Sequence, residues 1–121
     1  MDCIFCKIIN GEIPSFTIYE DETLKVFLDI HPDCNGHILI VPKKHITDID
    51  DMDVKTCGEI LTVTKKLKKK LEDKLQIDGL TLVQNNGCIQ EVKHFHLHLK
   101  PVYNNQQELK PVEDIYQLLK P

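Results

Sequence analysis

The sequence contains no arginine, no tryptophan and no alanine among its 121 residues. Because there is no guanidinium group to grip a phosphate with two parallel hydrogen bonds, a phosphate must be held by histidine, lysine, amide side chains or backbone N–H groups. The chain also lacks an apolar run long enough to cross a bilayer, and its first residues lack the basic stretch and apolar segment of a signal peptide. We therefore expect a cytoplasmic protein with no membrane partner.

Charge and cysteine content indicate which partners are disfavoured and in which state the thiols are. The formal net charge is −4, which argues against a nucleic-acid polymer as the main partner, because proteins that bind one usually carry a basic excess. The lysine run at 65–70 falls on the polar side of a helical pattern, so we interpret it as a solvated face. The five cysteines are an odd number, and inside a cell they predict reduced thiols or metal ligands in preference to disulfides.

Length and hydrophobic pattern predict one α+β domain. Apolar residues recur at helical spacing from Val54 to Leu75, which predicts one long helix. Strands are expected at 16–20, 24–28, 37–41 and 80–84, with a fifth over the histidine segment at 94–98 and short helical or loop segments at 3–10 and 112–119. Hairpin-type connections between these strands indicate a five-stranded antiparallel sheet.

Three of the six histidines alternate in the segment His94-Phe95-His96-Leu97-His98. Side chains spaced by two project from the same face of a strand, so the three imidazoles are expected to line one surface while the apolar residues between them face a core. Rings that titrate near neutrality in such a row indicate a working cleft. A fourth histidine, His37, begins the apolar strand 37–41, and Gly36 before it allows a backbone or ligand to approach closely.

The spacing Cys3-x-x-Cys6 allows two thiolates to share a tetrahedral zinc ion. Two cysteines are half of such a site, and the histidines available to complete it include His45 and His94. A Cys2His2 set would form a closed, structural site. Two alternatives remain at this point: ordinary buried cysteines, and a redox pair, which the lack of a preceding strand disfavours.

The motif from His94 to Pro101 resembles the defining motif of the histidine triad (HIT) superfamily of nucleotide hydrolases and transferases, and most of all its nucleotide-binding (Hint-like) branch of the zinc-containing bacterial type. The likeness extends in order over most of the chain, through the segments Ile4–Ile9, Gly11–Pro14, Phe27–Ile30, His37–His45, Asn85–Gly87 and Gln90–Val92.

This resemblance implies a HIT-like fold, with a five-stranded antiparallel sheet, one long and one short helix, and sheets joined across a homodimer. It implies a HIT domain at 1–103, with a tail at 104–121 that completes or flanks it. It also implies hydrolysis at the α-phosphorus of nucleoside phosphoramidates or related purine nucleotide conjugates through a covalent nucleotidyl-histidine.

The resemblance assigns roles residue by residue. His96 matches the nucleophile, His98 the histidine that contacts the phosphate oxygens, and His37 an additional histidine of the cleft. The implied nucleotide-binding residues are Asp29 at the ribose, Phe5, Ile8, Phe27 and Ile30 around the base, and Asn85, Gln90 and Glu91 at the phosphate. The implied ligands of a structural zinc are Cys3, Cys6, His45 and His94, and no catalytic metal is expected.

The chain departs from the family pattern at Lys93 and Lys100, which stand where apolar residues are common, and in a loop at 88–89 that is shorter than usual. Alternative activities are a dinucleoside polyphosphate hydrolase, a nucleotide-binding interaction protein with little turnover, and a metalloenzyme in which the three histidines share one ion. The last is awkward because same-face strand neighbours lie about 7 Å apart.

Overall fold

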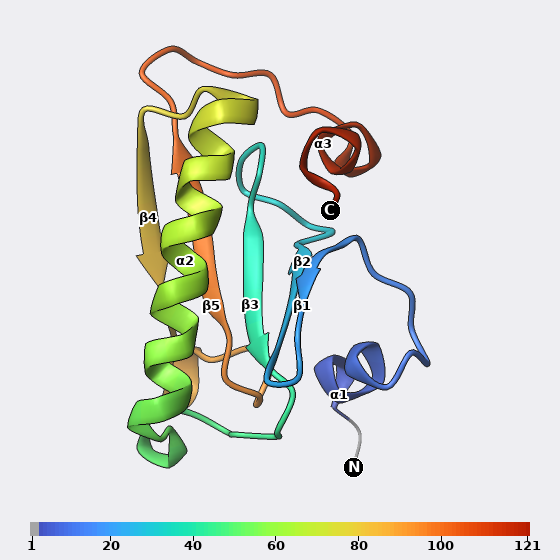
Figure 1. Cartoon of the computed structure of the whole chain (residues 1–121), viewed down its shortest axis with the longest axis vertical. Helices are drawn as coiled ribbons and strands as arrows, with labels where there is room; N and C mark the ends of the chain where they lie inside the picture. Colours follow the sequence, from blue (N-terminus) through green and yellow to red (C-terminus); the bar gives the residue numbers. More distant parts are fainter. Residues whose placement is uncertain (1–2) are drawn as a thin grey trace.

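The computed structural model describes residues 3–121; Met1 and Asp2, the start of the predicted domain, lie outside the described residues. Its sheet has five strands in the order β1-β2-β3-β5-β4, with every neighbouring pair antiparallel (Figure 1). The predicted α+β fold with a five-stranded antiparallel sheet is confirmed. The strands are β1 (Thr17–Glu20), β2 (Leu24–Leu28), β3 (Ile38–Pro42), β4 (Gly79–Val83) and β5 (Leu97–Val102), and the α-helices are α1 (Ile4–Ile9), α2 (Val54–Leu75) and α3 (Val112–Leu119).

The main core lies between the sheet and α2, and Figure 1 shows α2 lying along one face of the sheet, roughly parallel to the strands. Alternate residues of the strands face this core because successive side chains of a strand point to opposite faces. Leu24, Val26, Ile38 and Leu99 are completely buried there. Full burial of an aliphatic side chain contributes about 1.5–3 kcal/mol, so this face is the main source of stability.

The opposite face of the sheet carries a second, smaller core with α1. Phe5 of α1 packs there with Phe27 of β2 and with Leu39 and Val41 of β3. The two phenyl rings meet edge to face, with centroids 5.7 Å apart. The second core covers part of this face, so the neighbouring part around β5 remains open for a site.

Helix α2 begins and ends where the sequence predicts. Asp53 caps its start by accepting a hydrogen bond from Thr56 N at 3.0 Å, and Gln76 ends it in the left-handed conformation with φ of 51°. Its apolar side is buried on the sheet, and the lysines at 65, 66, 68 and 69 are exposed, as predicted.

The tail after β5 returns along the molecule to α3. Ile115 and Leu119 of α3 are buried in the main core, and the ring of Tyr116 lies against that of Phe16 with centroids 5.3 Å apart. Within residues 3–121, no helix combines the length and the hydrophobicity that a bilayer crossing requires.

Two local expectations need correction. The fifth strand begins at Leu97 and so contains His98 but not His94 or His96. The segment before Leu97 makes other hydrogen bonds, among them one from Phe95 N to Ile46 O at 2.6 Å. Because its backbone is held in this way, it does not join the sheet ladder. Gly36 serves packing rather than a ligand: its φ is +87°, and a Cβ there would lie 2.7 Å from Leu75 Cδ1 of α2.

Candidate active site and metal site

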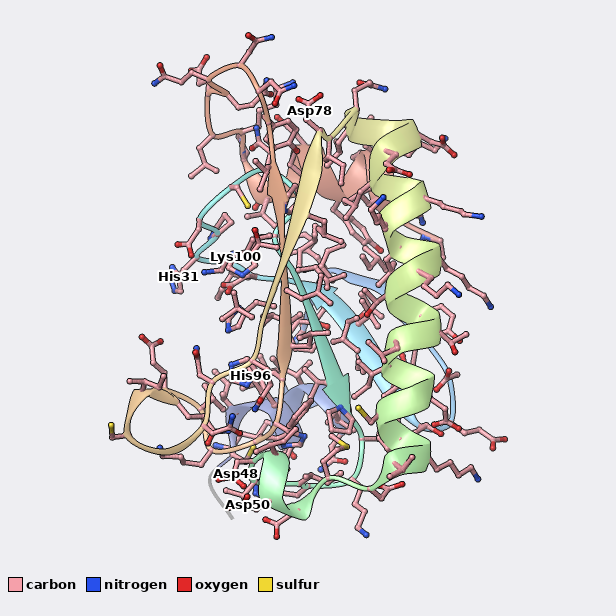
Figure 2. The ribbon with its side chains drawn as sticks, turned by 90° about the vertical axis from the view of Figure 1, so that its left-hand side faces the viewer. His31, Asp48, Asp50, Asp78, His96 and Lys100 are labelled. Atoms are coloured by element: carbon pink, nitrogen blue, oxygen red, sulfur yellow. The ribbon has the colours of Figure 1, made fainter. Side chains whose placement is uncertain are left out.

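A cleft of about 550 Å³ opens on the face of the sheet opposite α2, the side on which His96 and Lys100 are labelled in Figure 2. Residues of α1 and β2 line one end, and the other end is lined by the loop before β3, the segment 85–92 and the start of β5. This cleft brings residues between Ile4 and Leu39 together with residues between Asn85 and Lys100, which are far apart in the sequence.

His96 lies at the bottom of the cleft and is 6% exposed. Its Nδ1 lies 2.8 Å from the carbonyl oxygen of His94. A carbonyl can only accept, so Nδ1 carries the ring proton and the lone pair is on Nε2. The edge contact with Phe5, with centroids 4.9 Å apart, fixes the plane of the ring. The side chain is therefore held with one defined nitrogen available for bonding.

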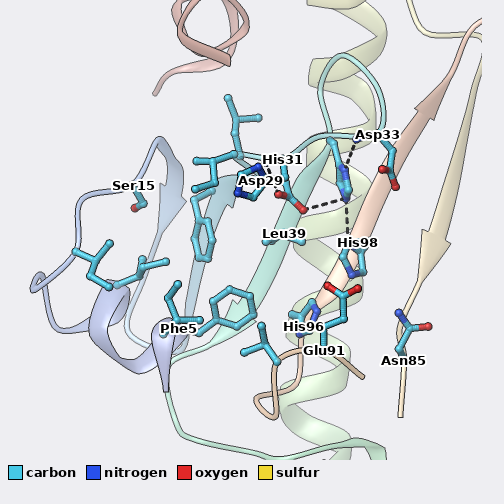
Figure 3. Close-up of a pocket in the computed structure, with 18 of the residues that line it drawn as sticks. Phe5, Ser15, Asp29, His31, Asp33, Leu39, Asn85, Glu91, His96 and His98 are labelled. Atoms are coloured by element: carbon cyan, nitrogen blue, oxygen red, sulfur yellow. Dashed lines mark hydrogen bonds and ion pairs between the residues drawn. The ribbon is translucent and has the colours of Figure 1, made fainter. Parts of the chain in front are cut away.

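His37 and His98 form a hydrogen-bonded pair beside His96 (Figure 3). The backbone N–H of Asp33 donates to His37 Nδ1 at 3.1 Å, so in the neutral ring the proton is on Nε2. His37 Nε2 then donates to His98 Nδ1 at 2.9 Å, which leaves the proton of His98 on Nε2. The rings of His96 and His98 are 4.8 Å apart, so a donor and a lone pair lie side by side in the cleft.

Burial keeps this pair of histidines neutral. It lowers the pKa of His98 to about 4, and the nearby His96 and His37 rings add to the effect. Burial also lowers the pKa of His37, against the opposing influence of the Asp29 and Asp33 carboxylates. At neutral pH both rings therefore act as hydrogen-bond relays without a net charge.

The residues predicted to bind the nucleoside also lie in the cleft. Asp29 accepts a hydrogen bond from His31 N at 2.8 Å, and its second oxygen is 3.6 Å from His37 Nε2. Phe5 and Phe27 are buried and Ile30 is 62% exposed at the rim. The lining residues of this end that the sequence predicts are Phe5, Ile8, Phe27, Asp29 and Ile30. An apolar floor next to a carboxylate suits a flat base joined to a hydroxylated sugar.

The predicted phosphate contacts divide into two groups. Asn85 and Glu91 both line the cleft, and Glu91 lies next to His96 in Figure 3. The side chain of Gln90 is buried and donates to the carbonyl of Thr47 at 2.6 Å, and it is not among the residues that line the cleft. Gln90 thus ties the segment 85–92 to the chain after β3.

Sequence reasoning missed two charged residues of this site, Lys100 and Asp33. Both line the cleft, and their side chains form an ion pair with Nζ and Oδ2 2.7 Å apart. The signal was present for Lys100, because it follows His98 by two residues and shares its strand face. Asp33 had no such signal, since only the folded loop brings it to β5.

The four predicted zinc ligands form a cluster next to the cleft. Cys3 Sγ is 3.3 Å from His94 Nδ1, and Cys6 Sγ is 3.3 Å from His45 Nδ1. One potential ligand atom from each of the four residues lies within 4.8 Å of the others. His94 Nε2 donates to the carbonyl of Pro42 at 2.8 Å, so its Nδ1 lone pair is directed at the cysteines. Pro42 O is available because the β3–β5 ladder pairs only Ile38 to Ile40.

The donor set fits a zinc ion. Tetrahedral zinc with Zn–S of about 2.3 Å and Zn–N of about 2.0 Å places neighbouring sulfur and nitrogen ligands about 3.5 Å apart, close to the observed separations. Burial and the neighbouring Cys3 thiol raise the pKa of Cys6, and a bound cation would reverse that effect by stabilising the thiolates. The bond from His94 to Pro42 is the type of outer contact that orients a histidine ligand.

A family model described as the HIT domain matches residues 10–105 of the chain. The chain belongs to the HIT domain family. This confirms the histidine triad resemblance.

Relatives and solved structures share this HIT domain over most of their length. An uncharacterised HIT-like protein of Methanocaldococcus jannaschii is 49% identical over 111 residues, which cover 88% of this chain and 84% of that protein. The adenosine 5′-monophosphoramidase of Candida albicans is 44% identical over 105 residues, 82% of this chain and 69% of that protein. The crystal structure of a Zn-bound histidine triad family protein from Mycobacterium smegmatis has a TM-score of 0.89 at 34% identity, covering 98% of this chain and 91% of that one.

Proposed function

We propose that this HIT domain hydrolyses purine nucleoside phosphoramidates or related nucleotide conjugates at the α-phosphorus, through a covalent intermediate on His96. One observation carries the proposal: His96 Nδ1 donates to the His94 carbonyl, which directs the Nε2 lone pair into a cleft that also holds a neutral donor, His98. A nucleophile with a fixed tautomer and an adjacent hydrogen-bond donor is the arrangement that covalent catalysis requires. The phosphoramidase activity named for the Candida relative supports the substrate class.

The reaction balances in two steps. In the first, His96 Nε2 forms a bond to phosphorus, the P–N bond of the substrate breaks, and the leaving nitrogen takes the electron pair and a proton that solvent supplies, while the Nε2–H of His98 donates a hydrogen bond beside it. In the second, water attacks the same phosphorus, the bond to His96 breaks, and the proton that water gives up returns to solvent and balances the one taken up in the first step. Two displacements with a good imidazole leaving group are each easier than one direct attack by water.

The charges of the cleft favour an amine over a polyphosphate as the leaving group. The carboxylates of Asp29, Asp33 and Glu91 line it, while Lys100 is the one lysine among the described lining residues and is paired with Asp33. His37 and His98 carry no charge at neutral pH because burial lowers the pKa of each. A chain of further phosphates would meet carboxylates without a free cation, and like charges in proximity repel strongly in a cleft.

We infer that zinc, held by Cys3, Cys6, His45 and His94, has a structural role. When bound, it would supply a cross-link between the start of α1 and the segment that leads into β5. The alternative of one ion shared by three histidines has no support, since the His94 ring faces the cysteines while His98 bonds to His37.

We also propose a homodimer. Strand β4 is at the edge of the sheet, and its Leu82 is 45% exposed, while Leu61 of α2 is 52% exposed. A free strand edge that carries an exposed leucine favours pairing with a second copy. Light scattering of the purified protein should give twice the chain mass, and a monomer at micromolar concentration would contradict this.

The decisive experiment traps the intermediate. The protein is mixed with an adenosine phosphoramidate and quenched within milliseconds to seconds, and the intact mass is recorded for the wild type and for His96→Ala. We expect an added adenylyl group on the wild type and none on the variant, with His31→Ala as a control that keeps the adduct. An adduct of equal yield on His96→Ala would overturn the assignment of the nucleophile.

A further inference from the structure

We propose that Lys100 and Asp33 are a positioning pair that fixes the tautomers of His37 and His98. The pair does this by holding the loop before β3 against β5, so that the Asp33 N–H stays bonded to His37 Nδ1. Its consequence for turnover rests on the proposed function, whereas its effect on the two histidines does not.

The contacts of the pair lead through the loop before β3 to His37 and His98 and so back to β5. Lys100 and His98 are two residues apart on β5 and share one face of the sheet. Lys100 Nζ is 2.7 Å from Asp33 Oδ2, and the backbone N–H of the same Asp33 is 3.1 Å from His37 Nδ1. His37 Nε2 returns to β5 through its 2.9 Å bond to His98 Nδ1. Asp33 is therefore connected to β5 twice. Its side chain binds Lys100 directly, and its backbone N–H reaches His98 through His37.

The direction of the hydrogen bond between His37 and His98 depends on Asp33. Its N–H can only donate, so it forces His37 to accept at Nδ1 and to donate at Nε2. His98 must then accept at Nδ1 and keep its proton on Nε2. If the Asp33 N–H moves away, His37 can hold its proton on Nδ1 instead and accept at Nε2. His98 can then hold its proton on Nδ1 and donate it to His37. The cleft would lose the donor beside His96.

The ion pair holds the part of the loop around Asp33, because the other side-chain anchors of the loop are at His31 and Asn35, on either side of it. Asn35 is 6% exposed and ties the loop to the tail, with Nδ2 donating to Glu108 O at 2.9 Å and Oδ1 accepting from Lys110 N at 2.8 Å. The Asp33 side chain is 64% exposed and bonds to Lys100 from the open side. With no arginine in the chain and no other lysine among the described residues of the cleft, nothing replaces Lys100.

The expected energetics separate positioning from stability. An ion pair with both side chains partly in water contributes little to folding, typically about 0–1 kcal/mol. Its loss should therefore leave the melting temperature nearly unchanged. A small movement of a hydrogen-bond donor at a catalytic group, by contrast, is enough to lower turnover.

The test measures the tautomers directly in the zinc-loaded protein without substrate. Long-range 1H–15N correlation spectra of 15N-histidine protein distinguish a protonated from an unprotonated ring nitrogen. In the wild type we expect His37 and His98 with protons on Nε2. In Lys100→Met and Asp33→Ala we expect a second tautomer of both rings, and Lys100→Arg should restore the wild-type pattern. Lys68→Met is the matched control, because it removes an ion pair of the same 2.7 Å length, Lys68 to Glu72, on the surface of α2.

Turnover of an adenosine phosphoramidate gives the second readout. We expect kcat to fall about tenfold in Lys100→Met, with little change in KM. This is less than the roughly 100-fold or more that an acid–base group contributes, because only part of the rings would change tautomer. Unchanged tautomers in both Lys100→Met and Asp33→Ala would overturn the proposal, and a raised KM with unchanged tautomers would make Lys100 a substrate contact instead. If the tautomers change while the wild type turns over no phosphoramidate, the positioning pair stands and the proposed function fails.

Discussion

His94 is joined to His96 through its backbone, and its own ring belongs to the metal cluster. The carbonyl oxygen of His94 accepts from His96 Nδ1 at 2.8 Å, while His94 Nδ1 lies 3.3 Å from Cys3 Sγ. A single residue therefore contacts the proposed nucleophile on one side and the proposed zinc ligands on the other. The metal site should influence the active site by position, without any contact between zinc and substrate.

Removal of zinc should lower both stability and activity. We expect the isolated protein to contain about one zinc per chain, as a closed Cys2His2 site predicts. Chelation should lower the melting temperature, because the cross-link between α1 and the segment before β5 is lost. Metal analysis, thermal melts and turnover would be followed together, with zinc added back as the control. Full activity in metal-free protein would contradict the structural role.

His98 should make the protein less stable as the pH falls from about 6.5 toward 4. Its pKa is lowered from 6.5 to about 4 by burial, so within this interval the unfolded chain binds a proton that the folded chain does not. The free energy of unfolding must therefore decrease with decreasing pH, and above pH 6.5 this group contributes no pH dependence. Urea unfolding of the zinc-loaded protein at several pH values should show a weaker decrease for His98→Gln. Parallel curves for the two proteins would show that His98 titrates normally.

Asp29 should select substrates with ribose hydroxyls. A hydrogen bond to a charged group is worth about 1.5–3 kcal/mol, so Asp29→Asn should lower kcat/KM for an adenosine phosphoramidate about 10- to 100-fold. The 2′,3′-dideoxy analogue should be a poor substrate for the wild type and be affected much less by the change. The ratio of the two specificity constants is the measurement. An equal loss on both substrates would show that Asp29 acts through His37, 3.6 Å away, and not on the sugar.

Two glycines with positive φ should respond differently to alanine. Gly36 has φ of +87° and its added Cβ would meet Leu75, Leu71 and Pro101, whereas Gly11 has φ of +81° with no heavy atom within 4 Å. We expect Gly36→Ala to lower the free energy of unfolding by about 2–4 kcal/mol, from conformation and overpacking together. Gly11→Ala should cost about 1–2 kcal/mol from conformation alone. Equal losses in denaturant unfolding would show that the contact with α2 is relieved at little cost.

Helix α2 and the strands β2, β3 and β5 could be predicted because α2 and β5 each carry a periodic apolar face, whereas β2 and β3 are short apolar runs buried on both faces of the sheet. The period of the apolar residues is a property of the sequence, and it fixes which side chains face the main core. The start of β5 could not be predicted this way. His94 continues the alternation, but its ring and backbone are held by Cys3, Pro42 and His96, and these contacts are stronger determinants than the pattern.

The sequence by itself determined the family, the order of the elements and the residue types that can perform the chemistry, because motif spacing and hydrophobic period are local. Only the tertiary structure decided the tautomer of each histidine, since that depends on whether the neighbouring group is a carbonyl or an N–H. It also decided that Gln90 turns away from the cleft and that Lys100 meets Asp33. Those contacts join segments far apart in the chain. The contact of Lys100 with Asp33 forms only when the sheet brings β5 next to the loop that precedes β3.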